Sequence, residues 1–407
     1  MRYFSHLDGL SAGALFHRLP ATFFQDSPPE VLAMALGATL YSPAVRPRLA
    51  EDILRCHAEG VMSMVGCLED SIRDSEVDEA ELNLAHQLRL LARMEAGGPL
   101  VFVRVRHADQ IYRLADRLGD DLRILSGFVL PKFRPDESGQ AGLKAVREIA
   151  DGSGLPLYAM PVLETPEIAY AETRMPTLLA VRDMLDGNRD RVLAVRVGAT
   201  DLSSIYALRR TAELTAWDVN VVAGILTDIV NVLARRGGWG GRGGPGSPTA
   251  GAGYEVTGPV WEYFSGGERV LKPQLRVTPF EDHDPMLRTK LVRQSLDGLI
   301  REIVLDKANG MVGKTVIHPS HAAAVHALSV VSHEEYCDAK AICEDYAGDG
   351  GGGVLRSVYM NKMNEVRPHL SWAERTLVRA DIFGVAAEGL DFVDFLEASV
   401  SSREPVA

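Results

Sequence analysis

Acidic side chains follow two strand-like, apolar runs near the middle of the chain. The run at 157–165 (LYAMPVLET) ends next to Glu164, and the run at 192–202 (VLAVRVGATDL) ends next to Asp201. A continuous apolar run that stops at an acid is typical of a buried parallel strand that delivers a carboxylate to the ligand-binding edge of an α/β sheet. Two carboxylates delivered to the same edge predict a site for a divalent metal ion.

Charged side chains also follow three strand-like runs earlier in the chain. Two of these runs are SMVGCLEDS and GFVLPKF. Between them lies the run VFVRVRH, in which period-two alternation places two arginines on one face. A charge at the end of any one strand is more often half of a structural salt bridge, because an unpaired buried charge is costly. Five consecutive strands that end this way favour a functional site, and its candidate residues are Glu69, Asp70, Arg104, Arg106, Lys132, Glu164 and Asp201.

The ligand atoms of this set restrict its chemistry. Carboxylate oxygens together with water suit Mg²⁺ or Mn²⁺, and the absence of clustered histidines and cysteines from the sequence argues against zinc. Arg104 can bind a carboxylate through two parallel hydrogen bonds. A metal ion that also binds an α-keto acid polarises its carbonyl group and stabilises the enolate that arises when a carbon–carbon bond forms or breaks.

The elements expected to position these residues alternate along the chain. Short β-rich runs at 38–44, 61–70, 101–107, 127–133, 157–165, 192–202, 254–264 and 315–320 are separated by amphipathic stretches at 48–57, 79–95, 111–118, 143–150, 166–185, 216–235 and 286–305. This alternation predicts an α/β protein with a (β/α)8 TIM barrel, and a doubly wound open sheet is the main alternative.

Two segments interrupt the alternation. The stretch 237–253 is glycine-rich and of low complexity, and we expect it to be a mobile insertion in a barrel domain that covers residues 38–332. A short N-terminal extension, residues 1–37, precedes this domain. The tail, residues 333–407, contains expected helices at 334–346 and 372–387 with a glycine run at 348–353 between them, and we expect a helical lid on a flexible hinge.

Composition and charge narrow the classes of function. The chain has 407 residues, of which 46% are hydrophobic, and its net charge of −12 disfavours a nucleic-acid partner. No apolar run approaches the roughly 18 residues of a membrane span, and the N-terminus lacks the regions of a signal peptide, so we expect a cytoplasmic location without a membrane partner. The four cysteines form no CxxC pair and are expected to be reduced thiols.

Seven motifs follow one another in an order that resembles a known superfamily. LYSPAVRP, CLEDSI, VFVRVRH, VLPKF, MPVLETP, RVGATDL and GKTVIHPS are ordered as in the HpcH/HpaI aldolases and citrate lyase beta subunits, and the resemblance covers about residues 38–390. The nearest resemblance is to a divergent branch of TIM-barrel carbon–carbon bond lyases associated with bacterial tellurium-resistance gene neighbourhoods. It implies a metal-dependent barrel enzyme that cleaves or condenses carbon–carbon bonds.

The resemblance also implies roles by position. The family has two magnesium ligands, an arginine that binds the substrate carboxylate, an acidic pair that holds metal-bound water or substrate, and a lysine in an LPK motif. The matching positions in this chain are Glu164 with Asp201, Arg104, Glu69 with Asp70, and Lys132.

Two departures from the family pattern affect the expected specificity and assembly. Arg106 stands where the family usually has asparagine, and its added positive charge is expected to favour a more anionic substrate. The family's lid often carries an aspartate that acts as an acid or base in the site of a neighbouring subunit, and Glu365 is the expected substitute here. A head-to-tail exchange of lids predicts a homo-oligomer, either a trimer or a hexamer.

Three functions stay open on the sequence. The favoured one is a Mg²⁺-dependent carbon–carbon lyase or aldolase that acts on a small anionic oxo- or hydroxy-acid or on its CoA thioester. A metal-dependent phosphotransferase or hydrolase on the same barrel is the enzymatic alternative, since Arg106 keeps a phosphorylated acid among the candidate substrates. The non-enzymatic alternative is a ligand-binding or scaffold subunit that has retained the pocket.

Overall fold

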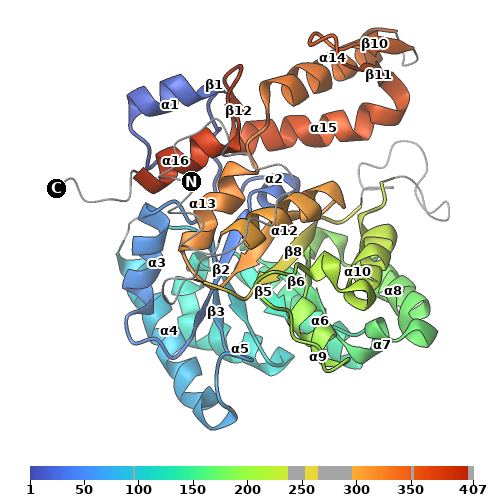
Figure 1. The fold of residues 1–407 in the computed structure, drawn as a ribbon. Helices are drawn as coiled ribbons and strands as arrows, with labels where there is room; N and C mark the ends of the chain where they lie inside the picture. The colour runs from blue at the N-terminus through green and yellow to red at the C-terminus, as the bar shows by residue number, and fades with distance from the viewer. Residues whose placement is uncertain (95–96, 237–252, 265–295, 350–352, 402–407) are drawn as a thin grey trace.

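Eight parallel strands close into a barrel in the computed structural model, which describes residues 1–94, 97–236, 253–264, 296–349 and 353–401 (Figure 1). Each strand pairs with the next one along the chain, and the last strand pairs with the first. The strands are β2 (Ala38–Pro43), β3 (Ser63–Cys67), β4 (Leu100–Arg104), β5 (Gly127–Leu130), β6 (Tyr158–Leu163), β7 (Val195–Val197), β8 (Val256–Trp261) and β9 (Val312–Val316). The predicted TIM barrel is confirmed, and each strand overlaps one of the eight expected runs.

Helices between the strands cover the outside of the barrel. Their buried faces carry apolar residues, and in α5 (Ala108–Leu118) these are Ile111, Leu114 and Leu118 at helical spacing. The others are α3 (Leu49–Ala58), α4 (Val77–Arg93), α6 (Glu137–Ser153), α7 (Pro166–Ala169), α8 (Ala171–Asp186), α9 (Ala199–Ser204), α10 (Asn220–Ile229), α12 (Asp297–Ala308) and α13 (Ser320–Ala327). The insertion expected at 237–253 and the first part of the helix expected at 286–305 lie almost wholly outside the described residues.

One expected strand is much shorter than its apolar run. The run 192–202 contributes only Val195–Val197 to the sheet, and the chain then turns at Gly198 into α9. Asp201 therefore lies in the first turn of a short helix and not at the end of a strand.

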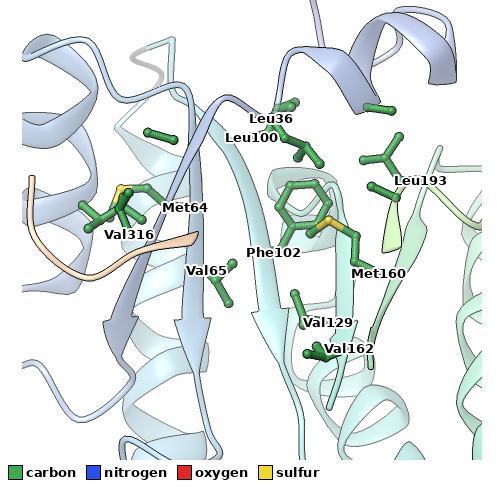
Figure 2. Packing of buried hydrophobic residues seen from close by; sticks show 14 of the residues in the cluster. Leu36, Met64, Val65, Leu100, Phe102, Val129, Met160, Val162, Leu193 and Val316 are labelled. Atoms are coloured by element: carbon green, nitrogen blue, oxygen red, sulfur yellow. The ribbon is translucent and has the colours of Figure 1, made fainter. Parts of the chain in front are cut away.

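Apolar side chains fill the barrel interior at the end where the strands begin. Figure 2 shows Phe102 of β4 and Met160 of β6 in this core, with Leu36 and Leu100 near the start of the strands. These four side chains are at most 1% exposed. Because this end is a packed core, polar side chains gather at the opposite end, where the strands stop.

The N-terminal extension and the tail pack together outside the barrel. Strand β1 (Phe16–Arg18) pairs antiparallel with β12 (Val385–Ala386), and a hairpin joins β10 (Val354–Arg356) to β11 (Met363–Glu365). The helices of these regions are α1 (Gly9–Leu15), α2 (Pro29–Met34), α14 (His333–Asp349), α15 (Val366–Phe383) and α16 (Phe392–Ser401). The helix expected at 372–387 thus begins earlier and ends before β12, and part of the expected hinge, 350–352, is outside the described residues.

The tail lies at the end of the barrel where the strands begin. Helix α15 contacts α2, which directly precedes β2, and the Arg375 side chain donates hydrogen bonds to Glu255 (2.6 Å) and to the carbonyl of Gly310 (3.1 Å), just before β8 and β9. In Figure 1, α14 and α15 are at the top, whereas α7 and α9, which follow β6 and β7, are at the bottom. The tail therefore does not cover the end of its own barrel where the strands stop.

None of the helices in the described part of the chain has the length and apolar character needed to cross a membrane.

Candidate active site at the carboxyl end of the barrel

A cavity of about 430 Å³ opens at the end of the barrel where the strands stop. Seven of the eight strands, or the loops that follow them, contribute to its lining. Its lining includes the charged residues Asp70, Arg104, Glu164, Arg196 and Asp201, together with Tyr41. Active sites of TIM barrels lie at this end, which makes the cavity the candidate active site.

Glu164 and Asp201 reach the cavity from two successive βα connections. Glu164 directly follows β6 and is 4% exposed, while Asp201 projects from the first turn of α9. Burial raises the pKa of Glu164 to about 7, and the negative charge of Asp201 adds to this effect against the opposing charge of Arg104. Two carboxylates facing one cavity repel each other, so a cation between them would stabilise both ionised forms.

Arg104, the last residue of β4, connects the acidic side chains of the site. Its Nη2 atom lies 2.6 Å from Glu69 Oε2, 3.1 Å from Asp70 Oδ2 and 3.3 Å from Glu164 Oε1. Its pKa is raised above the ordinary value, because Glu164, Tyr41 and Glu69 more than offset the effect of burial. Arg104 is therefore a permanent positive charge beside the predicted metal ligand.

Lys132 contacts the same acidic side chains as Arg104. Its Nζ atom lies 2.5 Å from Glu69 Oε1 and 3.1 Å from Asp70 Oδ1, and its backbone N–H donates a hydrogen bond to Glu164 Oε1 at 2.9 Å. The residue has a φ of +48°, a conformation that few side chains adopt. This backbone conformation lets one residue orient Glu164 through its amide and Glu69 with Asp70 through its ammonium group.

The pKa values of Glu69 and Asp70 are shifted in opposite directions. Burial raises the pKa of Glu69. The pKa of Asp70 is lowered, since a hydrogen bond from Glu69 and the charges of Arg104 and Lys132 outweigh the effect of burial. Neighbouring carboxyl groups whose pKa values move apart are suited to separate acid and base roles.

Arg106 lies apart from the charged side chains around Arg104. This corrects the expectation that Arg106 binds substrate beside Arg104. Strand β4 ends at Arg104, so period-two alternation does not extend to residue 106. The Arg106 side chain donates to the carbonyls of Leu68 (2.8 Å) and Ile72 (2.9 Å) and pairs with Asp74 (2.5 Å). Arg106 thus fixes the loop that carries Glu69 and Asp70, and it is not among the residues that line the cavity.

Glu365 is also separate from the cavity of its own chain. It ends β11 and directly precedes α15, in the tail that packs at the opposite end of the barrel. A role for Glu365 in catalysis consequently requires the cavity of another subunit.

Arg196, which lies on β7 and lines the cavity, was not predicted from the sequence. The available signal was an arginine inside the apolar run VLAVRVGATDL, at a position where a charge is costly to bury.

The donor atoms at Glu164 and Asp201 fit a hard divalent cation. Within the described ranges, no group of three or more His, Cys, Asp or Glu side chains is placed to bind a metal. The protein would therefore supply two carboxylates and leave the other positions to water and substrate, an arrangement that Mg²⁺ accepts.

A comparison with protein families places this chain in one of them. The family described as C–C bond lyase of the TIM-barrel fold matches residues 30–385. The chain belongs to this family. The predicted resemblance and the prediction of a carbon–carbon lyase are thereby confirmed at the level of the family.

The similar solved structures are distant from this chain in sequence. A citrate lyase from Burkholderia xenovorans LB400 is 16% identical, with 95% of this chain and 99% of that chain covered and a TM-score of 0.54. The CitE protein of Mycobacterium tuberculosis, in complex with magnesium, acetoacetate and coenzyme A, is 19% identical over 86% of this chain and 99% of that chain, with a TM-score of 0.49. No curated protein matches the chain.

Proposed function

We propose that this protein is a Mg²⁺-dependent lyase or aldolase that breaks or forms a carbon–carbon bond next to the carbonyl group of a small anionic oxo- or hydroxy-acid. The observation that supports this most strongly is the convergence of Glu164 and Asp201 on one cavity with Arg104 beside them. The proposal names the reaction class within the C–C bond lyase family.

Glu164 and Asp201 would hold the metal ion. When bound, a divalent cation supplies a positive charge that stabilises negative charge developing on a substrate oxygen. Mn²⁺ has similar ligand preferences and is the expected substitute. The raised pKa of Glu164 means that its ionised, metal-binding form is favoured from about neutral pH upwards.

Arg104 and the acidic pair would position the substrate and move a proton. Arg104 has a planar guanidinium group, which suits it to orient a substrate carboxylate at the cavity wall. Because the pKa of Glu69 is raised by burial and that of Asp70 is lowered, a proton held by the pair would reside on Glu69. Lys132 contacts both acids and keeps them beside Arg104, so that the proton stays near the reacting carbon.

We also propose that the tail acts between subunits. Because α14 and α15 lie at the opposite end of their own barrel, a lid function needs a homo-oligomer in which the tail of one chain reaches the cavity of another. A cyclic trimer or a hexamer built from trimers satisfies this requirement. Glu365 would then act as an acid or base at the neighbour's cavity.

The test of the proposed reaction is proton exchange at the carbon next to the carbonyl of a keto acid. We expect purified protein with Mg²⁺ to exchange the methyl protons of pyruvate for deuterium, as followed by NMR, and EDTA to stop this exchange. The variants Glu164→Gln and Asp201→Asn should lose exchange and Mg²⁺ binding, as measured by calorimetry. The matched control is Asp190→Asn, since Asp190 pairs with Arg147 on the surface away from the cavity. Mg²⁺ affinity that is unchanged in both site variants would refute the proposal.

A further inference from the structure

Arg196 is a buried arginine on the wall of the cavity. It is the central residue of β7, is 1% exposed, and lines the cavity together with Tyr41 and Thr315. The function proposed above assigns no role to Arg196. A positive charge placed here requires an explanation, since burying an unpaired guanidinium group is costly.

The hydrogen bonds of Arg196 are to neutral groups. Its Nη1 atom donates to Thr39 Oγ1 (3.3 Å) and its Nη2 atom donates to Thr315 Oγ1 (2.5 Å). The guanidinium carbon lies 5.4 Å from the centre of the Tyr41 ring, and the Nε–H group has no hydrogen-bond partner within the described structure. The threonines and the tyrosine fix the plane of the guanidinium group but leave its charge without an anion.

Other buried cations of the barrel are paired differently. Each of them has a carboxylate within 4 Å: Arg182 has Asp186, Arg210 has Glu302, and Lys314 has both Glu302 and Asp306. Among the fully buried arginines and lysines that the structure describes, Arg196 is the one without such a partner. If Arg196 had only a structural role, we would expect a carboxylate beside it, as at the other three positions.

The two arginines of the cavity are therefore not equivalent. Arg104 is surrounded by Glu69, Asp70 and Glu164, whereas Arg196 faces the same cavity with no carboxylate within 4 Å among the residues that the structure describes. Burial lowers the pKa of Arg196, in contrast to the raised pKa of Arg104. An anionic group of a ligand that entered the cavity would supply the missing partner.

We propose that Arg196 binds a second carboxylate of the substrate, so that the site selects oxo acids with two acidic groups over oxo acids with one. This inference rests on the proposed function, because the first carboxylate and the carbonyl are assigned to Arg104 and the metal ligands. The chemical class of the substrate is then a dicarboxylic oxo- or hydroxy-acid. Arg196 is a specificity-determining residue in this reaction.

The test compares acids that differ by one carboxylate. Calorimetry in the presence of Mg²⁺ gives the dissociation constants of 2-oxoglutarate and 2-oxobutyrate, and of oxaloacetate and pyruvate. We expect the wild-type protein to prefer the dicarboxylate of at least one pair by about tenfold or more, as a charged hydrogen bond in a buried site allows. Arg196→Met should reduce this ratio to near one, and Arg196→Lys should keep part of it because a lysine retains the charge without the planar fork.

The matched control is Arg182→Met, which removes another buried arginine from a helix outside the cavity and should leave the ratio as in the wild type. Circular dichroism and thermal melting check that each variant is folded. If Arg196→Met does not fold, a crystal structure of the wild-type protein with the preferred dicarboxylate replaces it, and the second carboxylate is expected within hydrogen-bond distance of Arg196.

The outcomes separate this inference from the proposed function. Keto-acid proton exchange with a dicarboxylate preference that Arg196→Met leaves unchanged overturns the role of Arg196 and leaves the lyase proposal standing. A preference that depends on Arg196 without any proton exchange supports the binding role and refutes the lyase proposal. A wild-type protein that does not prefer the dicarboxylate of either pair overturns the inference.

Discussion

Gly198 lies directly against the carboxylate of Glu164. A Cβ atom at position 198 would come within 1.9 Å of Glu164 Oε2 and within 2.6 Å of Glu164 Cβ. The backbone N–H of Gly198 also donates a hydrogen bond to the carbonyl of Leu163, the residue before Glu164, at 3.2 Å. The turn from β7 to α9 is therefore packed so closely on β6 that the two predicted metal ligands, Glu164 and Asp201, are held in a fixed relation.

This contact predicts that Gly198→Ala displaces Glu164 while leaving the barrel folded. A methyl group at this position must push the carboxylate out of its place, because the overlap is with a buried side chain that has little room to move. We expect Mg²⁺ affinity to fall by about tenfold or more, as measured by calorimetry. The control is Gly187→Ala, where the nearest atom to a new Cβ is 3.5 Å away. Unchanged affinity in Gly198→Ala would show that the contact does not position the ligand.

A second prediction concerns pH and the stability of the metal-free protein. The pKa of Glu164 is raised from 4.5 to about 7, mainly by burial. Between these two pH values the folded protein binds more protons than the unfolded chain, so this group's contribution to stability is present below about pH 4.5 and is lost as the pH rises through 7. Glu164→Gln cannot ionise and avoids this loss.

We therefore expect Glu164→Gln to melt at a higher temperature than the wild type at pH 8 in EDTA, by a few degrees, and to show a smaller advantage at pH 5. The same variant should fail to bind Mg²⁺, which would show that the ionised glutamate serves the metal site at a cost in stability. Melting curves across the pH range check this. A difference in melting temperature that is the same at pH 5 and pH 8 would contradict it.

The sequence was sufficient for the barrel and for most of the acidic group, because both follow from strong local patterns. Apolar runs followed by amphipathic stretches predict the strands and helices, and an acid directly after a run, such as Glu164, is placed by the end of its strand. Residues beyond the strand ends were less predictable. Arg106 was misplaced because alternation applies only while the strand lasts, and β4 ends at Arg104.

Long-range contacts account for the remaining differences. The pairing of β1 with β12 joins segments that are far apart in the sequence, and no local pattern indicates it. The role proposed for Arg196 could not be predicted for another reason. It rests on the lack of a carboxylate partner among the described residues, which only the three-dimensional arrangement can show.

The observed contacts of Arg106 give a third prediction, which replaces the expected effect on specificity. Arg106→Met removes the hydrogen bonds to the carbonyls of Leu68 and Ile72 and so loosens the loop that carries Glu69 and Asp70. We expect kcat to fall by about tenfold while the ranking of substrates stays the same, because the acids lose their fixed position and the cavity lining is unchanged. The control is Arg73→Met, since Arg73 lies in the same loop with a side chain that is 85% exposed. A changed substrate ranking in Arg106→Met would restore the original interpretation.

The last prediction concerns the tip of the tail. The β10–β11 hairpin exposes several large apolar side chains, with Val358 67%, Met360 69% and Met363 57% exposed. Exposed apolar groups gathered on one projecting hairpin are typical of an interaction site, and Glu365 lies at its end. We expect this tip to pack against a neighbouring subunit, and we expect the paired change Met360→Ser with Met363→Ser to shift the protein towards the monomer in analytical ultracentrifugation.

Mixing two inactive variants tests whether the tail completes a neighbour's site. Glu365→Gln and Arg104→Ala each disable the site to which they belong, but a mixed oligomer contains sites that combine an intact Arg104 from one chain with an intact Glu365 from another. Random mixing in equal amounts is expected to restore about a quarter of the wild-type activity if each site uses the tail of one neighbour. Neither variant alone should regain activity on dilution and reassociation. Full activity in a wild-type protein that sediments as a monomer would mean that the tail has no catalytic role, because α15 holds Glu365 at the opposite end of its own barrel from the cavity.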